Sequence, residues 1–319
     1  MARPALYLSR LLPDPVMSAI HTRFTLVTSP PLLPPLRADL LQGIRQADAA
    51  ICTLTERIDR EVLDAASRLR IVANYAVGFN NIDLETAKAR GVAVTNTPDV
   101  LTEATADLTW ALLLATARRL VEGDGLARSG AWAGWSPTEL LGLDVSGKTL
   151  GIVGMGRIGQ AVARRASGFD MAVRYTSHRT LPQAEGNPRW QQGSLEEVLR
   201  GSDFVSLHVP LTPETHHLIG DPQLRLMRPT AVLLNTSRGP IVHEAALVSA
   251  LQRGQLAGAG LDVYEDEPAI PAGLRHLKQV VLLPHLGSAT LQTRVRMGMV
   301  CLENVEAALA GRPVPNRVA

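Results

Sequence analysis

An apolar run that leads straight into a glycine-rich turn and a helical stretch constrains the fold more than any other feature. Residues 149–153 form the apolar run, Gly154-Met155-Gly156-Arg157-Ile158-Gly159 the turn, and residues 160–167 the helical stretch. In such a unit the glycines allow a tight turn and close approach of the backbone to a pyrophosphate, while the helix N-terminus offers free N–H groups to the anion. The segment predicts a dinucleotide site in a parallel sheet, with contacts from Gly154, Gly156, Arg157, Ile158 and Gly159.

Short apolar runs alternate with helical stretches along the whole chain, which is the order that builds parallel sheets. In the first half the runs cover residues 5–9, 24–29, 47–53, 71–77 and 92–97, with helical stretches such as 59–67 and 83–90 between them. A second series begins at Thr149, and its runs end near Thr176, Val209, Asn235, Val263 and Leu283. Because 319 residues is about twice the usual single-domain length, we predict an α/β protein with two doubly wound parallel-sheet domains.

The domain boundaries follow from the segments between these two series. Pro98 and Asp99 precede a long apolar helical stretch at residues 101–121, and a loop rich in Gly, Trp and Pro covers 123–147. The last helical stretch, about 289–310, has no strand after it and can return to the first domain. We therefore predict a Rossmann dinucleotide-binding domain at residues 98–288, and a second domain made of residues 1–97 and 289–319.

Composition argues against several other classes of protein. A net charge of +2 does not supply the basic field of a nucleic-acid-binding protein. The two cysteines, Cys52 and Cys301, fit neither a disulfide framework nor a zinc-ligand spacing, so we interpret them as packing thiols and expect no metal site. No stretch reaches the ~18 apolar residues of a membrane span, so a cytoplasmic location without membrane contact is expected.

The end of the next strand after the glycine turn indicates which dinucleotide binds. An enzyme that selects NAD usually has an acidic residue there, about 20 residues after the glycines, to bind the ribose 2′-hydroxyl. This chain has Thr176-Ser177-His178-Arg179 at that place, which offers hydroxyls and a cation. Ser177, His178 and Arg179 suit a 2′-phosphate, so we predict that NADP(H) is preferred and that NAD(H) is possible.

Polar side chains follow three of the later apolar runs. Arg238 follows the run that ends at Asn235, an acidic cluster of Glu265, Asp266 and Glu267 follows the next, and His285 follows the last. In open α/β sheets, ligands bind beyond the carboxyl ends of the strands. Reduction of a keto acid needs a cation for the carboxylate, an acid that protonates the carbonyl oxygen, and a carboxylate that keeps that acid charged. An arginine, a histidine and one acid of the cluster can fill these roles without a metal.

Several motifs in this order resemble the D-isomer-specific 2-hydroxyacid dehydrogenase family over nearly the whole chain. They are Tyr75-Ala76-Val77-Gly78-Phe79-Asn80-Asn81-Ile82-Asp83, the glycine turn, His208-Val209-Pro210-Leu211-Thr212, Asn235-Thr236-Ser237-Arg238-Gly239, Asp262 to Pro268, and Pro284-His285-Leu286-Gly287-Ser288. The resemblance implies a flavodoxin-like substrate domain beside the Rossmann domain, with substrate in a cleft between the two.

The resemblance also implies roles for individual residues. Arg238 is expected to bind substrate, His285 to act as the acid/base, and Glu267 to be its partner, while the N–H groups of Val77 and Gly78 would bind the substrate carboxylate. Asp262 would hold the nicotinamide carboxamide. Further cofactor contacts are expected from Val209, Pro210, Thr236, His285 and Gly287.

Within the family, the segment from Trp132 to Pro137 and the strand end without an acid are similar to the glyoxylate/hydroxypyruvate reductase branch. In that branch a tryptophan of the neighbouring subunit caps the substrate pocket, which implies a homodimer and favours Trp135 for this contact. The expected activity is NADPH-dependent reduction of glyoxylate or hydroxypyruvate to the D-2-hydroxy acid. An NAD-linked dehydrogenase for another D-2-hydroxy acid, and a dinucleotide-sensing module similar to a transcriptional corepressor, remain as alternatives.

Overall fold

The structure is a computed structural model that describes residues 3–178 and 187–319, and the chain forms two compact units. The first unit comprises Met1–Leu101 and Ser288–Ala319, and the second comprises Thr102–Gly287. Both boundaries differ slightly from the expected ones, which were placed after residues 97 and 288. The first difference arises because Val100 and Leu101 pack against the core of the first unit, so that the second unit begins only with helix α5 (Thr102–Ala117).

The first unit is built on a parallel sheet with strand order β2-β1-β3-β4-β5. This order is the flavodoxin-like one, in which helices cover both faces of the sheet. The strands are β1 (Ala5–Leu8), β2 (Thr25–Leu26), β3 (Ala49–Cys52), β4 (Ile71–Asn74) and β5 (Ala93–Thr95). Residues 24–29 yield only the short edge strand β2, and the other strands lie within the expected apolar runs.

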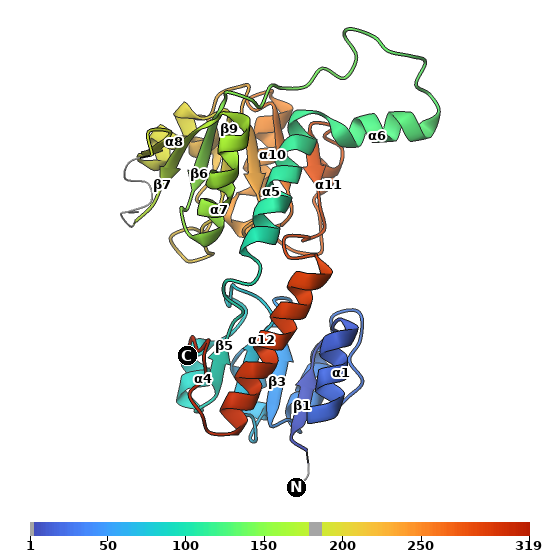
Figure 1. Cartoon of the computed structure of the whole chain (residues 1–319), viewed down its shortest axis with the longest axis vertical. Helices are drawn as coiled ribbons and strands as arrows, with labels where there is room; N and C mark the ends of the chain where they lie inside the picture. The colour runs from blue at the N-terminus through green and yellow to red at the C-terminus, as the bar shows by residue number, and fades with distance from the viewer. Residues whose placement is uncertain (1–2, 179–186) are drawn as a thin grey trace. The chain divides into compact units, whose positions relative to one another are not determined.

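Helices from both ends of the chain cover this sheet (Figure 1). They are α1 (Asp14–Arg23), α2 (Arg37–Ile44), α3 (Arg60–Ala65), α4 (Leu84–Ala89) and α12 (Leu291–Leu309). Helix α12 buries Met297, Cys301 and Leu302 against one face, as expected for a last helix that returns to the first domain. The chain end then pairs with β5 through a bridge between Thr95 and Arg317.

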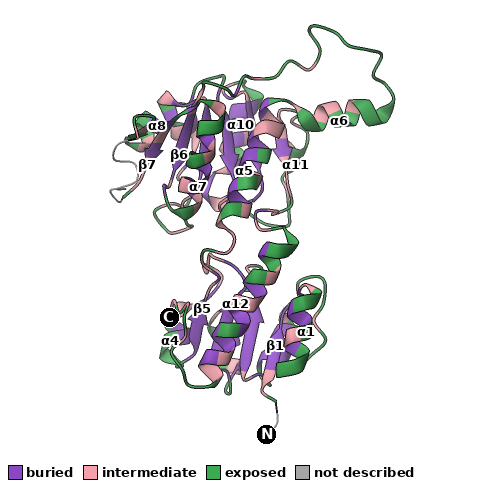
Figure 2. Cartoon of the chain, in the orientation of Figure 1, coloured by how far each residue is buried: buried purple, intermediate pink, exposed green. Residues whose placement is uncertain are grey.

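The second unit contains a longer parallel sheet with strand order β12-β11-β10-β9-β6-β7-β8. Its strands are β6 (Thr149–Val153), β7 (Ala172–Thr176), β8 (Trp190–Gln192), β9 (Phe204–Leu207), β10 (Val232–Asn235), β11 (Gly258–Leu261) and β12 (Val280–Leu282). The strand order reverses between β6 and β9, and dinucleotides bind at such a reversal. Figure 2 shows the buried strands of both sheets, which confirms the predicted α/β class with two doubly wound sheets.

The helices of the second unit include one that the sequence did not predict as separate. They are α5 (Thr102–Ala117), α6 (Leu120–Ser129), α7 (Arg157–Arg165), α8 (Leu195–Gly201), α9 (Asp221–Leu224), α10 (Glu244–Gln252) and α11 (Ala272–Arg275), with 3-10 turns at Ala166–Phe169 and Gly239–Ile241. The expected single helix over 101–121 ends at Ala117, because Arg119 adopts φ 52° and turns the chain. Helix α6 then occupies the first part of the expected loop and extends away from its sheet (Figure 1).

Cys52 and Cys301 are both buried and unpaired, as expected for packing thiols. None of the described helices is long and apolar enough to cross a membrane. Across residues 3–178 and 187–319, no group of three His, Cys, Asp or Glu side chains is arranged to hold a metal ion.

Candidate active site

The glycine turn lies between β6 and the N-terminus of α7, where its backbone is left open to a ligand. Gly154 has φ 96°, and a Cβ there would lie 2.7 Å from Val209 Cγ1 and 2.8 Å from the carbonyl carbon of His208. Only glycine fits this position. A Cβ on Gly156 would meet nothing within 4 Å, so there is open space in front of the helix N-terminus. This arrangement fits a dinucleotide pyrophosphate bound to the free N–H groups of α7.

The other predicted cofactor residues follow neighbouring strands at the same edge of the sheet. Val209 and Pro210 follow β9, and the Val209 carbonyl accepts a hydrogen bond from the Ser237 hydroxyl after β10. The Thr236 hydroxyl lies 2.9 Å from Thr109 Oγ1 on α5, so its side chain faces the protein interior. Gly287, after β12, is buried, and its carbonyl accepts from the Thr105 hydroxyl at 3.1 Å.

The segment after β7 is described only up to His178. Ser177 is partly buried, and its carbonyl accepts from Gln192 Nε2 at 3.1 Å, whereas His178 is exposed. Arg179, the predicted cation for a 2′-phosphate, lies outside the described residues. Preference for NADP(H) therefore stays a prediction.

The imidazole of His285 is paired with the carboxylate of Glu267. His285 Nδ1 lies 2.8 Å from Glu267 Oε2, and the Tyr264 N–H donates to Glu267 Oε1 at 3.1 Å. His285 has φ 56°, a left-handed conformation that costs free energy outside glycine and is often found at functional sites. The His285 N–H holds this conformation by donating to the Asp262 carbonyl at 2.9 Å. Both side chains are about a quarter exposed, 27% and 25%, so a ligand can reach the pair.

Glu267 is held in its charged form by its neighbours. Burial opposes ionisation, but the hydrogen bond and charge of His285, the Tyr264 N–H and the Arg238 charge together hold the pKa of Glu267 below its ordinary value. The carboxylate is therefore negative at neutral pH. A negative partner on Nδ1 stabilises the protonated imidazole and leaves Nε2 to exchange a proton with a ligand.

The two other acids of the cluster point elsewhere. Glu265 Oε1 accepts the Glu244 N–H at 3.0 Å and lies 2.9 Å from His217 Nε2, while Glu244 Oε1 accepts the Glu265 N–H at 2.9 Å. Asp266 is exposed. Glu244 was not predicted from the sequence, where its signal was an acid at the start of the helix after the Arg238 turn. Because Glu265 and Glu244 each accept the other's backbone N–H, Glu267 is the acid of the cluster that faces His285.

The guanidinium of Arg238 lies close enough to Glu267 for their charges to interact. Burial lowers the pKa of Arg238, and the charge of Glu267 acts against that shift. The Arg238 turn packs tightly against the segment after β11, and a Cβ on Gly239 would overlap the carbonyl group of Tyr264. Glycine at this position brings the arginine turn and the acidic segment together.

Asp262 is fully buried at the end of β11. Its Oδ1 accepts the Leu286 N–H at 2.6 Å and its Oδ2 accepts the Gly287 N–H at 2.9 Å. Burial raises the pKa of Asp262, and these two N–H groups oppose the shift. The side chain thus positions the His285 loop, and a contact between Asp262 and a carboxamide stays a prediction.

The remaining predicted substrate residues lie in separate parts of the chain. Val77 and Gly78 are in the first unit, after β4, and both are partly exposed. Trp135 is in the loop after α6 and is 82% exposed. It lines a hollow of about 280 Å³ together with Trp132 and residues of α6.

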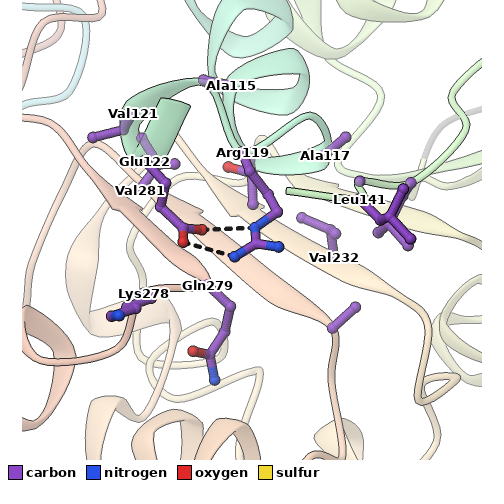
Figure 3. Close-up of a pocket in the computed structure, with 14 residues that line it drawn as sticks. Ala115, Ala117, Arg119, Val121, Glu122, Leu141, Val232, Lys278, Gln279 and Val281 are labelled. Atoms are coloured by element: carbon purple, nitrogen blue, oxygen red, sulfur yellow. Dashed lines mark hydrogen bonds and ion pairs between the residues drawn. The ribbon is translucent and has the colours of Figure 1, made fainter. Parts of the chain in front are cut away.

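A pocket of about 300 Å³ lies at the opposite edge of the second sheet from the loops that carry Arg238, Glu267 and His285. It is bounded by Val232 at the start of β10, by Gln279 just before β12, and by the bidentate pair of Arg119 with Glu122, at 2.9 and 2.8 Å (Figure 3). Its position at the amino ends of the strands separates it from the residues that could perform chemistry.

A glycine turn at a strand-order reversal, together with a histidine–carboxylate pair and a nearby arginine at the same sheet edge, defines the class of nicotinamide-dinucleotide oxidoreductases. The family described as D-isomer specific 2-hydroxyacid dehydrogenase, NAD binding domain, matches residues 110–287, which is more than half of the chain. The chain belongs to this family and is an NAD(P)-dependent oxidoreductase. The resemblance seen in the motifs is thereby confirmed.

Relatives and solved structures agree with this assignment over the full length. The glyoxylate reductase of Thermococcus gammatolerans is 50% identical over 320 residues, covering 99% of this chain and 96% of the relative. A crystal structure of a protein from Thermus thermophilus has a TM-score of 0.93 at 49% identity, covering 99% of this chain and 100% of that one. The NADPH-dependent glyoxylate/hydroxypyruvate reductase of Sinorhizobium meliloti, in complex with NADP and malonate, has a TM-score of 0.89 at 35% identity, covering 100% and 97%.

Proposed function

We propose that this protein reduces glyoxylate or hydroxypyruvate to the D-2-hydroxy acid with NADPH. The observation that carries the proposal is the 2.8 Å pairing of His285 Nδ1 with an ionised Glu267, close to Arg238. Full-length relatives named glyoxylate reductase support the substrate class. The test is to follow NADPH oxidation with glyoxylate, hydroxypyruvate and a panel of larger 2-keto acids. Absence of turnover with the whole panel would reject an enzymatic role of this kind.

In the proposed reaction each residue has a defined task. The chemistry that a bound nicotinamide dinucleotide supplies is hydride transfer to the carbonyl carbon. Protonated His285 gives its Nε2 proton to the carbonyl oxygen, and Glu267 stabilises the imidazolium before that transfer. The Arg238 guanidinium binds the carboxylate and polarises the carbonyl, and the N–H groups of Val77 and Gly78 bind the carboxylate. The hydride and the proton together convert the carbonyl to a hydroxyl group.

Cofactor preference gives the first prediction. NADPH should have a higher kcat/KM than NADH, because no acid stands at the end of β7 to bind a ribose 2′-hydroxyl. Arg179→Ala should raise KM for NADPH by at least about 10-fold and leave KM for NADH nearly unchanged, since a charge-assisted contact is worth ~1.5–3 kcal/mol. Initial rates with both cofactors measure this.

The control is Arg189→Ala, which removes an arginine that pairs with Asp170 at 3.3 Å near the edge strand β8. This variant should keep the KM of wild type for both cofactors. Preference of the wild type for NADH, or an equal response of both variants, would contradict the assignment of a 2′-phosphate site.

Assembly gives the second prediction. We propose that a second copy of this chain packs against the α6 arm, which is helix α6 and the loop after it, residues 120–141. None of the residues of α6 is buried, and the arm exposes Leu120, Val121, Trp132, Trp135 and Leu141 by 54–82%. Exposed apolar surface of this kind is typical of an interface, and closed two-fold dimers are the commonest assembly. Light scattering should therefore give about twice 34.3 kDa.

Val121→Asp should shift the mass toward the monomer, because it places a charge on the proposed interface. The matched control, Leu33→Asp, alters an apolar side chain of the first unit that is 74% exposed, against 60% for Val121, and should leave the mass unchanged. A wild-type monomer at micromolar concentration would rule out the dimer, and with it the contact of Trp135 with a neighbouring subunit.

A further inference from the structure

Three successive carbonyl groups after β4 are held by hydrogen bonds from polar groups of the first unit. The Ala76 carbonyl accepts the Thr97 N–H at 2.9 Å, and the Val77 carbonyl accepts Asn96 Nδ2 at 2.8 Å. The Gly78 carbonyl accepts Asn74 Nδ2 at 2.7 Å. The orientation of each peptide unit in this loop is therefore fixed from its carbonyl side.

The fixed carbonyls determine where the N–H groups point. In a trans peptide the N–H of one residue is antiparallel to the carbonyl of the residue before it. Since the carbonyls of Ala76 and Val77 face residues 96 and 97, the N–H groups of Val77 and Gly78 both point away from them. Among the described residues, neither N–H has a protein acceptor in hydrogen-bond geometry. Two adjacent N–H groups on one partly exposed side form a concavity suited to an anion.

The two asparagines that hold this loop are themselves well anchored. Asn74 is fully buried at the end of β4, and its Oδ1 lies 3.4 Å from Asn81 Nδ2. Asn96 follows β5, and its N–H donates to the Asn316 carbonyl at 3.3 Å. Asn74 is the last residue of β4 and Asn96 directly follows β5, so both side chains are fixed by the ends of strands. The loop that they hold is oriented by these two strand ends.

We propose that Asn96 and Asn74 are positioning residues that aim the N–H groups of Val77 and Gly78 at the substrate carboxylate. The inference rests on the proposed function, because that function supplies a 2-keto acid as the anion. Without the Asn96 amide, the peptide unit between Val77 and Gly78 can rotate, and its N–H no longer points steadily at the carboxylate. The carboxylate does not change during hydride transfer, so binding weakens equally in the ground and transition states.

The test is Asn96→Leu, which keeps the branching and the number of side-chain heavy atoms and removes the donor without adding a charge. KM for glyoxylate at saturating NADPH should rise about 10-fold, the equivalent of one hydrogen bond. The values of kcat and of KM for NADPH should stay within about 2-fold, the pattern of lost uniform binding. The dissociation constant of oxalate, titrated against the NADPH-loaded enzyme, should rise by the same factor as KM.

A matched control separates positioning from general stability. Thr86→Val has nearly the same shape and removes one partly buried hydrogen bond, from Thr86 Oγ1 to Asp83 Oδ2 at 2.6 Å, in the same unit. It should lower Tm about as much as Asn96→Leu and leave KM and oxalate binding unchanged. If Asn74→Leu folds, it should show the same rise in KM for glyoxylate and in the oxalate dissociation constant as Asn96→Leu. If it does not fold, the result with Asn96→Leu decides the positioning role.

The outcomes separate this inference from the proposed function. If the wild type reduces another 2-keto acid instead of glyoxylate, and Asn96→Leu raises its KM, the substrate assignment fails and the positioning role stands. If the wild type reduces none of the acids, oxalate binding decides alone. Equal oxalate affinity of wild type and Asn96→Leu, or a variant whose kcat falls while KM is unchanged, would overturn the positioning role.

Discussion

Replacing His285 with alanine should lower kcat/KM for glyoxylate by about 10²–10⁴-fold, the usual contribution of a general acid. The dissociation constant of NADPH should rise by no more than a few-fold, because His285 is only one of several expected cofactor contacts and the glycine turn is untouched. Stopped-flow single turnovers and a fluorescence titration with NADPH measure the two quantities. A variant that keeps more than a tenth of wild-type activity would show that another group supplies the proton.

Glu267→Gln is the companion variant, because it keeps the shape of the partner and removes its charge. The pKa of Glu267 is held low, so the wild-type carboxylate is negative throughout the neutral range. Loss of that charge makes the protonated imidazole less stable, and reduction needs the protonated form. The basic limb of the kcat/KM profile should therefore move to lower pH, with activity partly retained at mildly acid pH. An unmoved limb, or one at higher pH, would remove Glu267 from the pair.

Replacing Arg238 with alanine should lower kcat/KM by about 10²–10⁴-fold, because two charge-assisted hydrogen bonds worth ~1.5–3 kcal/mol each are lost. Arg238→Lys should recover little of this, since a lysine ammonium lacks the planar fork that matches a carboxylate. Steady-state kinetics with glyoxylate should show a higher KM and a lower kcat, because the guanidinium also polarises the carbonyl.

The control for Arg238 is Arg228→Ala in the same unit, whose guanidinium pairs with Asp203 at 2.7 Å before β10. It lies at the amino edge of the sheet and should keep wild-type kinetics. An Arg238→Ala enzyme with kinetics within about 3-fold of the control would exclude a substrate role for the guanidinium.

Much of the fold could be predicted from sequence because buried parallel strands are continuous apolar runs. The run at 149–153 is strand β6 as expected. The break between α5 and α6 was not predictable in this way, since Leu120 and Val121 continue the apolar pattern and only the left-handed backbone of Arg119 turns the chain. Strand β8 was missed because it is a three-residue edge strand, Trp190–Gln192, with one apolar side chain.

The apolar pattern predicted the candidate site to the level of strand ends, and only the family resemblance selected Glu267 as the partner of His285. Three adjacent acids followed one strand, and strand periodicity alone could not select Glu267. The selection depends on Glu265 being turned toward Glu244, which lies 21 residues away in sequence. Asn96 also follows a strand, but its proposed positioning role depends on a hydrogen bond to the Val77 carbonyl in another loop. A side chain's contact with a distant backbone carbonyl cannot be predicted from the sequence pattern.

The discontinuous first unit has a consequence for the order of events during synthesis. Domains usually fold as they leave the ribosome, with the N-terminal one first. Here the sheet of the first unit emerges early but has one apolar face without its α12 cover, since that helix is encoded after the second unit. The intervening segment Thr102–Gly287 carries its own complete sheet. The second unit therefore completes its fold first, and the first unit stays without this helix until α12 has been made.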